Sequence, residues 1–132
     1  MTLDEILTAD LAELGRFIAS RTGNTEAAAI ARSSAPQLRY DDQAIKTVMD
    51  PQARGMFSPE ELGALIRRID NQARRLAMWR AWGLVYGTKP SVEDLENWEA
   101  DGGAEAVDGC WVEPDGVCEH GAPSWLLVLG LI

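Results

Sequence analysis

The stretch FSPEELGALIRRIDNQARRLA, residues 57–77, carries the clearest helix signals of the chain. Ser58 is a favoured N-cap residue, Pro59 suits the first helical position, and Glu61 completes a capping box with Ser58. The apolar residues that follow recur at intervals of three and four, as on one face of an α-helix. They are Leu62, Leu65, Ile66, Ile69, Ala73, Leu76 and Ala77. The pattern therefore predicts a long helix that runs from residue 59 to about residue 86.

The C-terminal part of this predicted helix has a different character from its beginning. The run AMWRAWGLVYG, residues 77–87, is apolar on all sides, so we expect burial on several sides before Gly87 ends the helix. Other helices are predicted on both sides of it from caps, periodic apolar residues and breakers. They cover residues 3–22, 25–32 and 41–49, and the segment from Ser91 to Asp101.

The whole chain has the size and composition of one globular domain. It has 132 residues, of which 46% are hydrophobic and 25% are charged. We therefore predict a single, mainly α domain over residues 1–132. Residues 1–100 form a small helical bundle, and residues 101–132 form a Cys/His-bearing β-hairpin with a short apolar terminal segment packed on it.

The segment DGCWVEPDGVCEHG, residues 108–121, holds the only two cysteines and the only histidine of the chain. The residues from Glu113 to Gly116 are typical of a tight turn, and short apolar pieces flank them. The pattern predicts a hairpin whose turn brings Cys110 close to Cys118. His120 lies two residues beyond Cys118, so the two side chains share one side of an extended strand.

These residues suggest a structural metal site. Thiolates and imidazole are preferred zinc ligands, and a small hairpin gains stability from a bound metal ion. The predicted ligands are Cys110, Cys118 and His120, with Asp108 as the fourth. Other nearby carboxylates, on Glu113, Asp115 and Glu119, are alternatives for the fourth position.

Two other interpretations of the same residues stay open. In the first, Cys110 and Cys118 are reduced and act as small buried hydrophobic residues, with His120 bonded to the backbone. In the second, the cysteines form a redox pair, or one of them is a nucleophile activated by His120. A cytoplasmic location disfavours a permanent disulfide.

The charge of the chain is unevenly distributed. Residues 1–90 have a net charge of +1, whereas residues 91–132 hold ten acidic residues and no lysine or arginine. Such a surface keeps a protein soluble, and it can also bind a basic partner. Direct binding to nucleic acid is not expected, because it needs clustered positive charge. The residues expected to bind a protein partner are Trp111, Glu113, Asp115, Glu119 and Trp125.

The apolar end of the chain, from Trp125 to Ile132, has two interpretations. It completes the core of the domain itself, or it forms the surface of a homodimer or another complex. The sequence shows neither a secretory signal nor a membrane span. We therefore expect a cytoplasmic protein, or one that acts in the cytoplasm of a host if its source is a virus.

The familiar catalytic motifs are missing from the sequence, which favours a protein that is not an enzyme. We expect a protein-binding or regulatory protein with an acidic C-terminal surface and a structural zinc ion. One alternative is a phage-type inhibitor that occupies the nucleic-acid-binding channel of a basic partner. The other alternative is a small metal- or thiol-dependent enzyme that acts at Cys110, Cys118 and His120.

Overall fold

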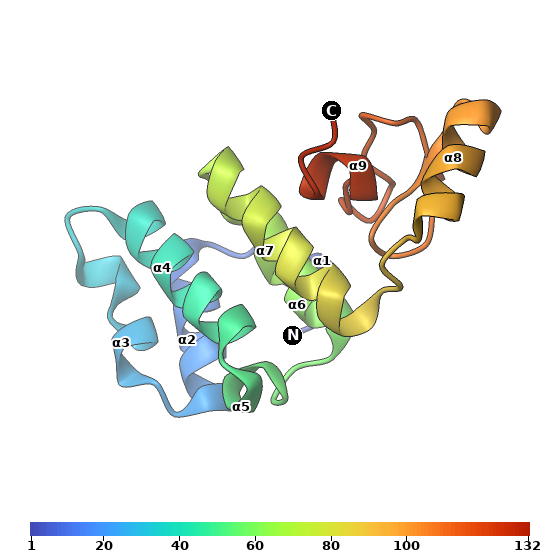
Figure 1. Ribbon diagram of the computed structural model, residues 1–132. Coiled ribbons are helices and arrows are strands. Elements are labelled where there is room, and N and C mark those ends of the chain that lie inside the picture. Colours follow the sequence, from blue (N-terminus) through green and yellow to red (C-terminus); the bar gives the residue numbers. More distant parts are fainter. The chain divides into compact units, whose positions relative to one another are not determined.

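The computed structural model describes all residues from 1 to 132 and confirms the predicted fold class (Figure 1). It contains nine α-helices, one short 3₁₀ helix and a two-stranded antiparallel sheet near the C-terminus. The chain divides into two compact units, Met1–Arg75 (unit 1) and Leu76–Ile132 (unit 2). The expectation of a single domain stays a prediction, and each unit is described by itself.

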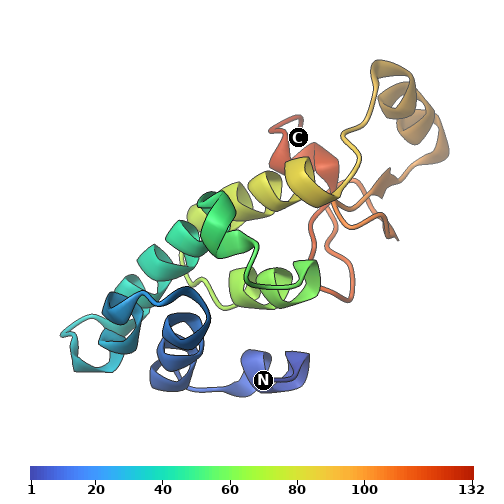
Figure 2. The same ribbon diagram turned by 90° about the horizontal axis from the view of Figure 1, so that it is seen from below.

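Unit 1 is built from short helices around an apolar core. Helices α2, α3 and α4 lie side by side (Figures 1 and 2). Tyr40 is fully buried in this core, and its hydroxyl donates a 2.6 Å hydrogen bond to the carbonyl of Leu65. The elements of unit 1 are α1 (Leu3–Thr8), α2 (Leu11–Thr22), α3 (Thr25–Ala28), the 3₁₀ helix η1 (Ile30–Arg32), α4 (Pro36–Met49), α5 (Pro51–Arg54), α6 (Pro59–Arg67) and the start of α7 (Gln72–Tyr86).

The prediction of one helix over residues 3–22 is wrong, because the structure divides this segment into α1 and α2. Ala9 ends α1 in an extended conformation. Asp10 then caps α2, and its carboxylate accepts a 2.8 Å hydrogen bond from the amide of Glu13. A capping aspartate satisfies an amide at the helix start that would otherwise lack a partner, and this stabilises a new helix at that point.

The prediction of one long helix from residue 59 to residue 86 is also wrong. Helix α6 ends at Arg67, and α7 begins at Gln72. The buried carboxylate of Asp41, on α4, accepts hydrogen bonds from the amides of Asp70 (3.1 Å) and Asn71 (3.2 Å). The apolar periodicity continues through this corner, but the tertiary contact with Asp41 favours the break.

Two further boundaries differ from the predictions. Helix α4 begins at Pro36, five residues earlier than expected, because proline at the first helical position starts a helix. The predicted helix over residues 25–32 is divided between α3 and η1. The capping box at Ser58 and the helix stop before Asp50 agree with the predictions.

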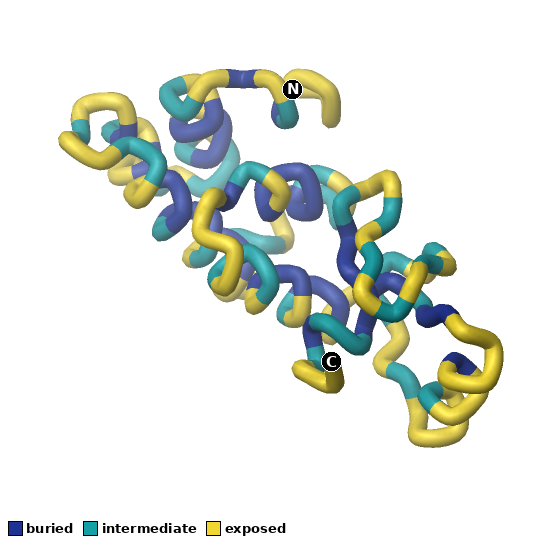
Figure 3. The backbone as a smooth tube through the Cα atoms, turned by 90° about the horizontal axis from the view of Figure 1, so that it is seen from above, coloured by how far each residue is buried: buried dark blue, intermediate teal, exposed yellow.

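Unit 2 contains the remainder of α7, together with α8 (Val92–Asp101), β1 (Ala104–Glu105), β2 (Trp111–Val112) and α9 (Trp125–Val128). Helix α8 agrees with the predicted helix after Ser91, and Ser91 and Asp94 form its capping box. Figure 3 colours the backbone by burial. In α7 the buried residues are Met78, Trp79, Trp82 and Gly83, which recur at helical spacing. The expected burial of its C-terminal turn is wrong, because Leu84, Val85 and Tyr86 are exposed.

The predicted hairpin has a different strand pairing in the structure. The turn from Glu113 to Gly116 is present, with a 2.8 Å hydrogen bond between the two residues. However, β2 pairs with β1, whereas Val117 forms an isolated bridge with Pro123. The hairpin therefore lies between β1 and β2, and it is joined by the loop that contains Asp108 and Cys110. No helix of the structure has the length and apolar character needed to cross a membrane.

Candidate metal centre

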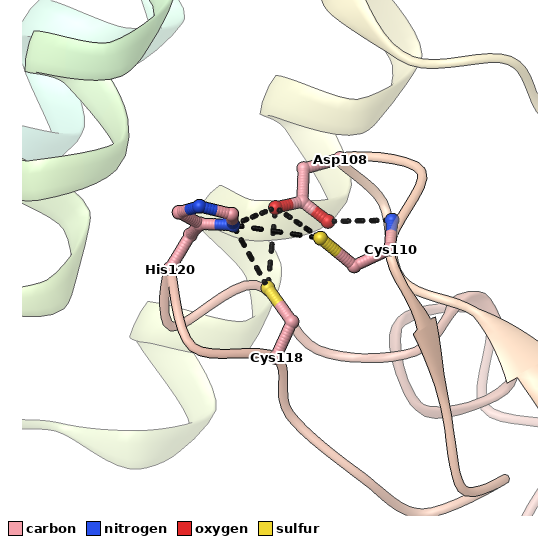
Figure 4. A group of neighbouring side chains, drawn as sticks. All are labelled: Asp108, Cys110, Cys118 and His120. Carbon is pink, nitrogen blue, oxygen red and sulfur yellow. Dashed lines mark hydrogen bonds and ion pairs between the residues drawn. The ribbon is translucent and has the colours of Figure 1, made fainter.

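The side chains of Asp108, Cys110, Cys118 and His120 converge in unit 2 (Figure 4). Each offers one donor atom, and all four donor atoms lie within 4.8 Å of one another. Both cysteines are free thiols. The four residues therefore lie close enough together to hold a metal ion.

The distances within this cluster resemble the edges of a coordination tetrahedron. Zinc bonds of about 2.0–2.3 Å place the donors of a tetrahedral site about 3.3–3.8 Å apart. His120 Nδ1 lies 3.5 Å from Cys110 Sγ, 3.7 Å from Cys118 Sγ and 3.0 Å from Asp108 Oδ2. Asp108 Oδ2 lies 3.6 Å from the sulfur of Cys110 and 3.1 Å from that of Cys118. These five distances lie close to the range expected for a tetrahedral site.

Two similar turns supply the four side chains. In the first, Asp108 and Cys110 are separated by Gly109, whose φ of 93° lies in the left-handed region. In the second, Cys118 and His120 are followed by Gly121, whose φ is 80°. Glycine adopts this conformation without the steric cost that other residues incur. Each turn therefore bends the backbone sharply beside a pair of donors.

Backbone amides stabilise the negative groups within these turns. The amide of Cys110 donates a 3.2 Å hydrogen bond to Asp108 Oδ1. Burial raises the pKa of the Cys118 thiol, and the backbone amides of His120 and Ala122 act in the opposite direction without outweighing burial. The amide of Cys118 donates a 2.9 Å hydrogen bond to the carbonyl of Ala122.

The local environment also changes the acidity of the three acidic groups. Burial raises the pKa of the Asp108 carboxyl, but hydrogen bonds from Cys118, Cys110 and His120 outweigh burial, so its pKa lies below the ordinary value. Burial, with a contribution from the charge of Asp108, raises the pKa of Cys110 to about 11. Burial and the hydrogen bond to Asp108 raise the pKa of Cys118. Both thiols are therefore protonated at neutral pH when no metal ion is bound.

The cluster lies at the surface of unit 2. The side chain of Asp108 is 16% exposed, whereas that of His120 is 61% exposed. His120 presents Nδ1 to the cluster, and its Nε2 lies 3.7 Å from Glu119 Oε1 on the outer side. A carboxylate on the second ring nitrogen helps to orient an imidazole ligand.

The other residues named from the sequence lie outside the cluster. Glu113 and Asp115 are exposed on the turn that follows β2, and Glu119 approaches the outer edge of His120. Trp111 is 55% exposed, whereas Trp125 is 1% exposed and belongs to the core of unit 2. Trp125 thus belongs to the core and is no part of the exposed surface, whereas Leu131 and Ile132 at the end of the tail are exposed.

Sequence reasoning missed the role of the two turns. Asp108-Gly109-Cys110 and Cys118-Glu119-His120-Gly121 each combine donor residues with a glycine, and this pattern was a usable signal. Comparison with protein families, with curated proteins and with solved structures finds no match for this chain.

Proposed function

We propose that this chain is a non-enzymatic protein-binding or regulatory protein whose C-terminal unit is stabilised by one zinc ion. The convergence of two thiols, an imidazole and a carboxylate within 4.8 Å is the observation that supports this proposal. The zinc ion keeps the two turns together, and the exposed acidic surface of the same unit binds the partner.

Zinc fits this donor set better than the other common metal ions. Magnesium and calcium prefer oxygen ligands, whereas Cys110, Cys118 and His120 offer sulfur and nitrogen. Zinc accepts all three of these donors and a carboxylate oxygen in a tetrahedral arrangement. Binding requires both thiols to lose their protons, so zinc affinity falls at acidic pH.

A structural role for the ion follows from the composition of the site. Catalytic zinc sites use three protein ligands and keep one position for water or substrate, whereas structural sites are closed by four protein ligands. Asp108, Cys110, Cys118 and His120 are enough to close the site. Beyond α8, the unit has only two strands of two residues each and a final helix of four residues, so the segment that carries the cluster has little regular structure of its own.

The geometry offers less support for the enzymatic alternative. A metal-dependent enzyme needs an open coordination position, and four protein donors leave none in a tetrahedral site. A thiol enzyme needs a cysteine with a low pKa, whereas the pKa values of Cys110 and Cys118 are both raised. Turnover that depends on either thiol would contradict the proposal.

Elemental analysis of the full, untagged chain tests the zinc ion directly. We expect about one zinc ion per chain, and we expect Asp108→Asn and Cys118→Ser to lower the zinc content. Asp115→Asn is a matched control, because Asp115 is an exposed acidic residue in the same segment but outside the cluster. This control should keep the zinc content of the unmodified chain.

A second measurement guards against loss of metal during purification. The protein is first stripped with a chelator, and zinc is then titrated back while free thiols are counted with a thiol reagent. Zinc should protect both cysteines from the reagent in the unmodified chain and in Asp115→Asn. If no metal binds and both thiols react freely at every zinc concentration, the proposed zinc site is wrong.

A further inference from the structure

The indole ring of Trp111 packs against Gly103, and the residue is largely exposed to solvent. The side chain is 55% exposed although it is one of the largest in the chain. A Cβ atom placed on Gly103 would come within 2.6 Å of three atoms of the indole ring. The ring therefore occupies the space that a side chain would fill at Gly103. Gly103 therefore covers part of the ring, and the remainder of the indole stays exposed.

Two glutamates neighbour Trp111. Glu105 in β1 is the residue directly opposite Trp111 in β2, and opposite residues of an antiparallel pair project from the same face. Glu113 follows two residues after Trp111 and is exposed. The residues next to Trp111 in the sheet and along the chain are therefore acidic. Residues 91–132 contain no lysine or arginine, and the basic residues of unit 2 are Arg80 and Lys89.

Unit 1 contains the same combination of groups with its cation in place. The guanidinium of Arg21 lies 4.8 Å from the ring centroid of Phe17 and 5.4 Å from that of Phe57. The same guanidinium forms two hydrogen bonds with the carboxylate of Glu61, at 3.0 and 3.1 Å. An arginine thus bridges an aromatic face and a carboxylate within unit 1, as cation–π attraction and ion pairing favour.

We propose that Trp111, Glu105 and Glu113 bind an arginine side chain in a basic, extended segment of a partner protein. The planar guanidinium stacks on the exposed part of the indole and forms hydrogen bonds with the carboxylates. Lysine fits less well, because its compact ammonium group neither stacks on the ring nor pairs in a bidentate way. This inference rests on the proposed function, because Trp111 directly follows the zinc ligand Cys110 in the chain.

A defined peptide tests the proposal without knowledge of the natural partner. The probe is a short synthetic peptide in which arginine alternates with serine, and its binding to the full, zinc-loaded chain is measured by calorimetry at low salt. We expect saturable binding that weakens as salt is added. The matching lysine peptide should bind more weakly, and a peptide with glutamine in place of arginine should not bind.

Variants then locate the binding surface. Trp111→Ala should weaken binding of the arginine peptide by about tenfold or more, as expected for a central aromatic contact residue. Glu105→Gln with Glu113→Gln should weaken it and reduce its salt dependence. Val92→Ala is the control, because Val92 is 72% exposed in the same unit and lies on α8. This variant should bind like the unmodified chain.

Zinc analysis of the same samples separates failure of this inference from failure of the proposed function. If zinc is present but Trp111→Ala binds the peptide like the unmodified chain, the proposed arginine site is wrong and the proposed zinc site is supported. Absence of peptide binding in the zinc-loaded chain also overturns the arginine site. If no zinc binds, the proposed zinc site is wrong, whether or not the arginine peptide binds.

Discussion

The two units of the chain differ in how many large apolar side chains each one buries. Of the twelve largest fully buried side chains, ten belong to unit 1, and only Val107 and Trp125 belong to unit 2. Unit 1 buries the apolar faces of several helices, whereas unit 2 brings together, from two glycine-containing turns, four side chains that lie close enough to hold a metal ion. Under the proposed function, the metal ion compensates for the smaller apolar core of unit 2.

Removal of the metal should have the largest effect and should act on unit 2. Zinc binding contributes about 10–16 kcal/mol in small zinc-dependent peptides, more than the whole stability of many domains. With a chelator, we expect amides of unit 2 near the cluster, such as those of Ala106 and Cys118, to lose protection from hydrogen exchange. Both amides donate backbone hydrogen bonds within this unit.

Amides in the core helices of unit 1 serve as the internal control for that experiment. The measurement is hydrogen exchange followed by mass spectrometry of fragments from the two units, with zinc and with the chelator. Fragments from α2 and α6 should exchange at the same rate in both conditions. Equal deprotection of both units, or no change in unit 2, would contradict the contrast between the units.

A cavity in the core should affect unit 1 strongly while leaving the metal centre intact. Leu65 is fully buried on α6, and replacement of a buried leucine by alanine costs about 2–5 kcal/mol. Leu65→Ala should therefore lower the midpoint of urea unfolding, and the zinc content should stay unchanged. Leu38→Ala, at a residue that is 55% exposed, should change stability by less than about 0.5 kcal/mol. Similar effects of the two variants would refute the described core.

Loss of the Asp41 charge should lower the stability of the segment between α6 and α7. Asp41→Asn weakens the hydrogen bonds to the amides of Asp70 and Asn71, and we expect a loss of about 1–3 kcal/mol. Asp42→Asn is the matched neighbour, because Asp42 is 40% exposed and pairs with Arg74 at the surface. Such a pair contributes up to about 1 kcal/mol. Thermal unfolding of both variants should show the larger loss for Asp41→Asn.

The smallest expected effect is a pH dependence of stability in unit 1. The hydrogen bond from Arg21 lowers the pKa of Glu61, burial opposes this shift, and the amide of Ser58 adds to it. A lowered folded-state pKa means that the stabilisation is present above the unfolded-state value and is lost as the pH falls through the folded-state value. Glu61→Gln should therefore melt at a lower temperature than the unmodified chain at pH 7. The two curves should converge in acid, and a constant difference at every pH would exclude this ion pair as the cause.

Local signals made much of this fold predictable. The predicted capping box at Ser58 is present, and the helices α1 and α8 begin with capping boxes at Thr2 and Ser91, because such a box depends only on residues three apart. The errors occurred where a distant residue decides the structure. The corner after α6 depends on Asp41 in another helix, and the strand partner of Trp111 is Glu105 instead of Val117. Neither pairing can be deduced from spacing along the chain.

The candidate site was more predictable than the sheet beside it for the same reason. Its four donors lie within one segment, from Asp108 to His120, so proximity in sequence already implied proximity in space. The detailed arrangement of the four donors could not be predicted as well from the sequence. The left-handed conformations of Gly109 and Gly121 place the donors, and a glycine in a sequence indicates such a conformation without fixing it.

The closeness of the four donors along the chain also has a consequence for the order of events during folding. Closing a short loop costs less entropy than closing a long one, and loops of about ten residues close within about 10–100 ns. The segment from Asp108 to His120 can therefore sample a ligand-competent arrangement before Trp125 packs into its core. Metal capture would then be an early event in this unit, and its folding rate would rise with zinc concentration.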